Sequence, residues 1–87
     1  MRAIVVYNEE SDHAREVISY LADFTRQTGR ELEVVDPESP EGSSFCRTYD
    51  IVEYPSVVAL SDDGIMQNLW RGRPLPTIGE VSSYAEN

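Results

Sequence analysis

The sequence predicts an α/β domain in which helices cover both faces of a mixed four-stranded sheet, in the order β-α-β-α-β-β-α. Short apolar runs rich in β-branched residues, typical of buried strands, alternate with amphipathic segments of helical period. The turn sequence Ser61-Asp62-Asp63-Gly64 separates the last two apolar runs, as in an antiparallel hairpin. With 87 residues there is room for one hydrophobic core, so residues 1–87 are expected to form a single domain.

The first two elements are a strand and a helix. Residues 2–8 form a nearly continuous apolar run that is typical of a buried strand. Residues 12–28 carry apolar side chains at helical spacing, with Ser11 or Asp12 as the expected N-cap and Gly29 in place for a left-handed C-cap. The stripe expected to face the core consists of Ala14, Val17, Ile18, Leu21, Ala22 and Phe24 or Thr25.

A second strand and a short helix follow. Residues 31–36 alternate polar and apolar side chains and predict a strand, parallel to the first. Residues 37–42 contain two prolines, a glycine and two acids, which favours a loop. Ser43 or Ser44 is then expected to cap a short helix that carries Cys46.

The last part of the chain predicts a hairpin and a closing helix. Residues 56–60 form a third apolar run, and residues 65–70 are expected to return as its antiparallel partner. Thr77 and Glu80 have the spacing of a capping box, so a final helix is expected over 78–86.

The charge balance argues against two classes of partner. The chain has sixteen acidic and seven basic residues, a net charge of −9, and every basic residue is an arginine. Such a chain repels phosphate groups and anionic lipid headgroups. We therefore expect neither a nucleic acid nor a membrane surface as the partner.

A lone cysteine, Cys46, excludes a disulfide within the chain and any CxxC motif. No stretch approaches the ~20 apolar residues of a membrane span. The expected location is the cytoplasm, where thiols stay reduced. Neither a cofactor nor a metal ion is expected.

The order of the elements, with a proline directly before the third strand, resembles the thioredoxin-like fold. Residues 49–58, YDIVEYPSVV, are similar to the family's stretch Y-x-I-x-x-(I/V/T)-P-(T/S). Asp63-Gly64, Gly72 and the closing helix follow at family-like spacing, so the resemblance covers essentially the whole chain. It implies a thioredoxin-like sandwich in which Pro55 is the family's cis-proline beside a groove.

The chain departs from the family at the redox motif. When the first strand and helix are aligned with those of the family, Ser11-Asp12-His13-Ala14 stands in place of Cys-x-x-Cys. Dithiol exchange needs an attacking and a resolving thiol at this helix terminus. We therefore predict that the domain has no dithiol oxidoreductase activity, and a non-catalytic role is favoured.

Two alternatives use single side chains. Ser11 resembles the hydroxyl of glutathione transferases, which implies a glutathione-like ligand at Ser11 and Tyr54-Pro55; its simpler role is that of an N-cap. Cys46 has Arg47 beside it near a helix start, which is compatible with a reactive thiol in single-thiol redox or thiol transfer. The more common interpretation of such a cysteine is a small buried apolar residue.

Two acidic groups could suggest a metal ion. His13 lies among acids, but neighbouring helical side chains diverge by about 100°, so the acids are better explained by the helix dipole. The loop acids Asp36, Glu38 and Glu41 lack the regular ligand spacing of an EF-hand. No metal site is predicted in either place.

The favoured function is binding of a protein or peptide at one end of the sheet. There the resemblance places the loop after the first strand beside Tyr54-Pro55 and Arg71-Gly72-Arg73. Aromatic and arginine side chains are enriched at binding hot spots, whereas Trp70 is expected to pack at the strand end. The predicted binding residues are Ser11, Asp12, Tyr54, Pro55, Arg71, Gly72 and Arg73.

Overall fold

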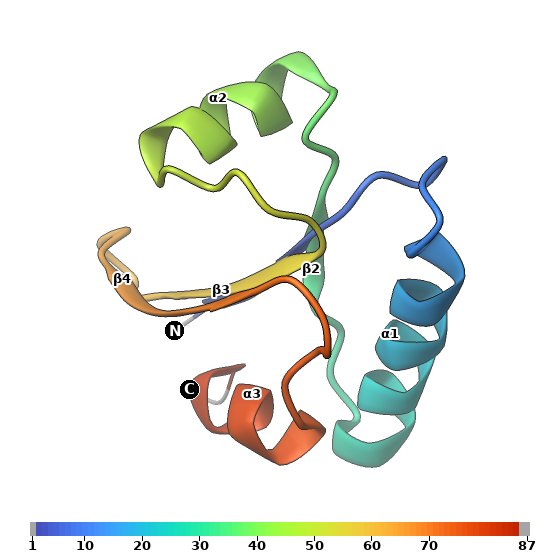
Figure 1. Cartoon of the computed structure of the whole chain (residues 1–87). Helices are drawn as coiled ribbons and strands as arrows, with labels where there is room; N and C mark the ends of the chain where they lie inside the picture. The colour runs from blue at the N-terminus through green and yellow to red at the C-terminus, as the bar shows by residue number, and fades with distance from the viewer. Residues whose placement is uncertain (1, 86–87) are drawn as a thin grey trace.

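The predicted order of strands and helices is confirmed in a computed structural model, which describes residues 2–85. The strands alternate with the helices as expected, and the last two strands form a hairpin (Figure 1). The elements are β1 (Arg2–Val6), α1 (Ala14–Thr28), β2 (Glu33–Val35), α2 (Pro40–Thr48), β3 (Ser56–Leu60), β4 (Met66–Arg71) and α3 (Ile78–Ala85).

The four strands form one mixed sheet in the order β2-β1-β3-β4. β1 is parallel to β2 and antiparallel to β3, and β3 is antiparallel to β4. In this register Val6 pairs with Ser56, and Ser56 pairs with Arg71. The end of β1, the start of β3 and the end of β4 therefore lie at one end of the sheet, which we call the Pro55 end.

Each face of the sheet has its own core. Figure 1 shows α2 on one side of the sheet and α3 on the other, with α1 beside α3. Alternate strand residues divide accordingly, so that Val5 and Val57 belong to the core under α1 and α3, whereas Ile4 and Val58 belong to the core under α2.

No helix in residues 2–85 is long and apolar enough to cross a membrane.

The prediction that Ser11 or Asp12 caps α1 is wrong. The helix begins at Ala14, and its N-cap residue, His13, makes no capping hydrogen bond through its side chain. Asn8 organises the preceding turn instead: its carbonyl accepts the hydroxyl of Ser11 at 2.6 Å and its side-chain oxygen accepts the amide of Glu10 at 2.9 Å. The hydroxyl of Ser11 is therefore turned back toward the loop.

The predicted start of the second helix is also wrong. α2 begins within the expected loop, at Pro40, and the side chain of Ser39 accepts the amide of Gly42 at 2.9 Å. Proline is favoured at the first helical position because it has no amide hydrogen to leave unpaired. Ser43 and Ser44, the expected caps, lie inside the helix.

The buried face of α1 is narrower than the apolar stripe. Val17 and Phe24 are fully buried, but Ile18 is 55% exposed and Ala22 is also exposed. β2 lies at the edge of the sheet and has only three residues. Ala22 lines a hollow beside β2, whereas Ile18 lines a hollow at the start of α1.

The first two strands are shorter than predicted, while the closing helix starts as expected. β1 does not extend to residue 8 because Asn8 opens a turn, and β2 covers three residues of the expected 31–36. The predicted capping box is confirmed: the amide of Glu80 donates to the hydroxyl of Thr77 at 3.1 Å, and the amide of Thr77 donates to the Glu80 carboxylate at 3.2 Å. The last residue expected in this helix lies outside the described residues.

Candidate functional site

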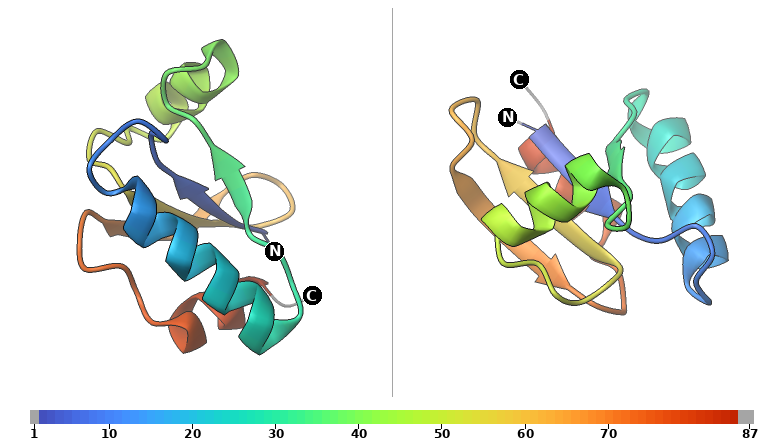
Figure 2. Two further views of the ribbon diagram at one scale, coloured as in Figure 1. Left: turned by 90° about the vertical axis from the view of Figure 1, so that its right-hand side faces the viewer. Right: turned by 90° about the horizontal axis from the view of Figure 1, so that it is seen from above.

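Three loops lie at the Pro55 end of the sheet. They are the segment after β1, the segment before β3 and the segment after β4, as the strand register requires. Figure 2 shows the chain leaving and entering the sheet there, with α1 starting close by. The topology therefore brings the predicted binding segments to one end of the molecule.

The segment before β3 presents Tyr54. Its peptide bond to Pro55 is cis, Pro55 is buried, and Tyr54 is 39% exposed. The turn is held on its other side by Ser56, whose hydroxyl donates to the carbonyl of Glu53 at 2.6 Å. Among the backbone hydrogen bonds of residues 2–85, none uses the amide or the carbonyl of Tyr54. Tyr54 is thus a partly exposed aromatic residue whose amide and carbonyl have no backbone partner.

The side chain of Tyr54 lies close to Ile51, which follows α2, and to Cys46 of α2. Its hydroxyl donates to the carbonyl of Ile51 at 3.3 Å. Burial raises the pKa of Tyr54, and the neighbouring Cys46 thiol raises it further. Cys46 is a free thiol that is itself buried in the core under α2. No sequence pattern indicates this contact, because the two residues belong to different elements.

Two carboxylates lie near the segment Arg71–Arg73, which begins at the last residue of β4. The Arg73 guanidinium lies 3.4 Å from the Glu16 carboxylate of α1. Gly72 has a φ of +67°, and a Cβ at this position would lie 3.1 Å from the carboxylate of Glu53. Arg71 ends β4 and is exposed. The segment Arg71–Arg73 therefore lies next to two other parts of the chain: Glu53 in the loop before β3 and Glu16 near the start of α1. The sequence analysis did not single out either glutamate.

Ser11 and Asp12 lie on a different surface. They line a hollow on the outer side of α1 together with Glu9, Arg15 and Ile18. Neither Tyr54 nor the arginines after β4 line this hollow. The seven predicted residues therefore divide into a group at Tyr54 and Arg71–Arg73 and a second group at the start of α1.

His13 and Trp70 have packing roles. The His13 ring stands edge-on to Tyr7, with 6.4 Å between the ring centroids, and its buried Nε2 has no hydrogen-bond partner. Trp70 is partly buried and packs edge-on against Tyr84 at 5.5 Å. Within residues 2–85 no three side chains of histidine, cysteine, aspartate or glutamate gather as a metal site.

Tyr20 on α1 carries a second buried polar atom without a partner, its hydroxyl. Burial raises its pKa to about 12, and the negative charge of Glu80 adds to the shift. Because the folded-state pKa lies above the ordinary 10.0, ionisation of this phenol is penalised in the folded state, so the domain loses stability as the pH rises from 10 towards 12.

Replacing Tyr20 by phenylalanine is expected to raise the free energy of unfolding at pH 7 by about 1 kcal/mol, because an unpaired buried hydroxyl is removed. The variant should also lose less stability than the parent between pH 10 and 12. Urea unfolding at pH 7, 10 and 12 measures both effects. Tyr49→Phe is the control; its hydroxyl donates to the carbonyl of Gly64 at 2.7 Å, so about 1 kcal/mol should be lost. Equal losses in both variants would contradict the prediction.

Comparison with known proteins gives one solved structure and no sequence match. No protein-family model matches the chain, and no curated protein matches it. The fold is similar to that of thioredoxin 1 from the thermophilic eubacterium Thermosipho africanus, with a TM-score of 0.66 and 17% sequence identity. The match covers 97% of this chain and 89% of that one. The chain therefore has a thioredoxin-like fold, as its element order implied.

Proposed function

We propose that this domain binds an extended peptide of another protein at the Pro55 end and carries out no dithiol redox chemistry. The observation that carries the proposal is the state of Tyr54, which is 39% exposed and whose backbone amide and carbonyl have no backbone partner in residues 2–85. An extended peptide can pair with those two groups while its side chains contact the ring.

The charged neighbours of Tyr54 suit a polar peptide. Arg71 is exposed, and Arg73 is paired with Glu16 at 3.4 Å across a half-exposed contact. Such an exposed pair is weak, about 0–1 kcal/mol, so a carboxylate of the peptide can replace Glu16 at little cost. Arginine and tyrosine are also the side chains that most often dominate binding energies.

The position of the single thiol supports a non-catalytic role. The residues at the start of α1 are Ser11-Asp12-His13-Ala14, and the chain's one cysteine, Cys46, lies in α2. Cys46 is 7% exposed, so a substrate disulfide has little access to it. Thiol–disulfide exchange depends on an accessible thiolate.

Selection from a displayed library of random peptides tests the proposal. We expect the domain to enrich peptides, and Tyr54→Ala to weaken their binding about 5- to 30-fold, the loss typical of an aromatic hot spot. Tyr54→Phe should keep most of the affinity because it retains the ring. Ile65→Ala is the control, since Ile65 is 60% exposed but lies in the β3–β4 turn, at the opposite end of the sheet.

Two results would overturn this function. One is a selection that enriches no peptide over a library exposed to the support alone. The other is a set of enriched peptides whose Kd is unchanged in Tyr54→Ala while the variant retains the circular dichroism spectrum and urea midpoint of the parent.

A further inference from the structure

The free edge of β2 is a second place where backbone groups are available. β2 is one of the two edge strands of the sheet and pairs with β1 alone. The Val35 carbonyl accepts the amide of Tyr7 at 3.2 Å, so Val35 faces β1. Because alternate residues of a strand direct their amide and carbonyl to opposite sides, those of Val34 point away from the sheet. Val34 is 47% exposed.

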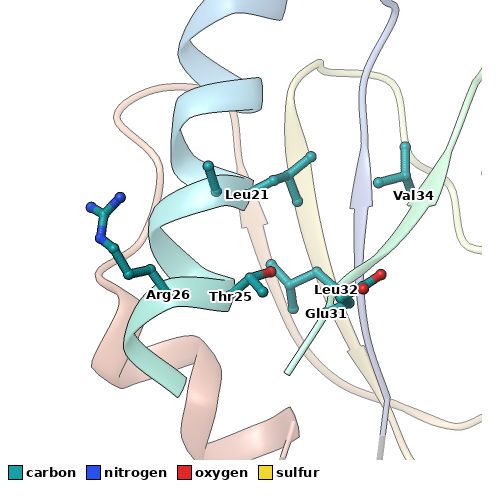
Figure 3. A pocket seen from close by; sticks show the side chains of 7 residues that line it. Leu21, Thr25, Arg26, Glu31, Leu32 and Val34 are labelled. Carbon is teal, nitrogen blue, oxygen red and sulfur yellow. The ribbon is translucent and has the colours of Figure 1, made fainter. Parts of the chain in front are cut away.

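A hollow lies on each side of this edge. On the α1 side there is a hollow of about 540 Å³, lined by Leu21, Ala22, Thr25 and Arg26 of the helix and by Glu31, Leu32 and Val34 of the β2 segment. Figure 3 shows Leu21 and Thr25 pointing from α1 toward the β2 segment, while Arg26 points away. Four of the seven lining residues, Leu21, Ala22, Leu32 and Val34, are apolar.

The hollow on the α2 side has a different character. It has a volume of about 460 Å³, an apolar part formed by Val35 and Phe45, and two acids, Asp36 and Glu41. No basic side chain lines it. Residues 31–45 contain five acids and no basic residue, and of these acids Glu33 is already paired with Arg2 at 2.8 Å. The α2-side hollow thus combines an apolar wall with uncompensated negative charge.

These features match one kind of occupant. A strand added beside β2 would pair with the backbone of Val34 and would direct alternate side chains to the two faces of the sheet. One side chain would enter the apolar hollow beside α1. The next would enter the hollow beside α2, where a lysine or arginine can lay its aliphatic stem on Phe45 and place its charge near Asp36 and Glu41.

We propose that the edge of β2 binds an extended, basic segment of a partner protein by strand addition. The charge of the chain argues against a second copy as the occupant, since each copy carries a net charge of −9 and no lysine. This surface shares no residue with the one around Tyr54, so the proposal does not depend on the function proposed above.

The probe is a capped synthetic peptide of alternating valine and lysine, titrated into ¹⁵N-labelled protein. We expect the largest amide shift changes at Val34 and its neighbours in β2, with a Kd of about 0.1–1 mM. A peptide of alternating proline and lysine has the same length and charge but cannot form a strand. It should bind at least about tenfold more weakly. A valine–glutamate peptide should not bind.

Two pairs of variants locate the site. Val34→Lys should weaken the valine–lysine peptide at least about tenfold, because the new charge blocks the edge and repels the probe. Gln67→Lys makes the same charge change on an exposed residue of β4, the other edge strand, and should alter the Kd less than about twofold. Glu41→Gln should weaken binding about two- to fivefold, the effect of one exposed ion pair. Glu9→Gln should leave the Kd unchanged.

Three results would overturn the inference. Equal binding of the proline–lysine and valine–lysine peptides would show general charge attraction. Equal losses in Val34→Lys and Gln67→Lys would show that the β2 edge is not the site. A dimer in sedimentation equilibrium that Val34→Lys dissociates would show that the edge binds a second copy.

Discussion

Replacing Phe24 by alanine is expected to lower the free energy of unfolding by about 3–5 kcal/mol. Phe24 is the largest of the fully buried side chains, and it packs in the core under α1 and α3 with Val17, Val57 and Val81. Its removal leaves a cavity that the rigid sheet cannot close. A small domain is stable by about 5–15 kcal/mol, so the loss is a large part of the total. Urea unfolding followed by circular dichroism measures it.

Ile18→Ala is the matched control on the same helix. Ile18 belongs to the apolar stripe of α1 but is 55% exposed, so its truncation should change the free energy of unfolding by less than about 0.5 kcal/mol. Comparable losses in the two variants would contradict the orientation of α1 described above and would place Ile18 in the core, where the stripe alone had predicted it.

Replacing Gly42 by alanine is expected to destabilise the domain by about 2–4 kcal/mol, although alanine is the better helix former. A Cβ at Gly42 would lie 1.7 Å from the carbonyl oxygen of Asp36 and 2.8 Å from the side-chain oxygen of Ser39. Both atoms belong to the turn that leads into α2, so the helix start and the turn would have to separate. The urea midpoint measures the loss.

Gly79→Ala is the control for this substitution. Gly79 also lies in the first turn of a helix, α3, but a Cβ at this position would have no atom of another segment within 4 Å. The variant should be as stable as the parent or more stable by up to about 1 kcal/mol, the difference in helix propensity. If Gly42→Ala were also neutral, α2 could not pack against the Asp36 turn as the structure shows.

Strands and helices with a clear apolar or capping pattern could be predicted from the sequence. The residue at which a helix begins was harder to predict. The continuous apolar run of β3 predicts a buried strand, and the spacing of Thr77 and Glu80 predicts a helix start. Both predictions are confirmed. The start of α2 has three candidate serines within a few residues, each a good cap. The choice of Ser39 depends on the turn formed by Asp36, whose carbonyl accepts both the amide and the hydroxyl of Ser39.

The contacts at the candidate site could not be predicted from local sequence. The pairing of Arg73 with Glu16 joins residues 57 positions apart, and the approach of Tyr54 to Cys46 depends on how the loop after α2 folds back. The resemblance to the thioredoxin-like fold did predict that Tyr54 and the arginines lie at one end of the sheet, because the strand order determines where they lie. It could not show that Ser11 faces a separate hollow, since that follows from the turn at Asn8.

The measurement that most directly tests peptide binding at the Pro55 end is an amide chemical-shift map of the ¹⁵N-labelled domain with a library-selected peptide. We predict the largest changes at Tyr54 and at Arg71–Arg73, and their loss in Tyr54→Ala. Glutathione, titrated separately, should leave Ser11 and Tyr54 unchanged. Peptide-induced changes confined to other surfaces, or glutathione-induced changes at Ser11 and Tyr54, would contradict the proposed function.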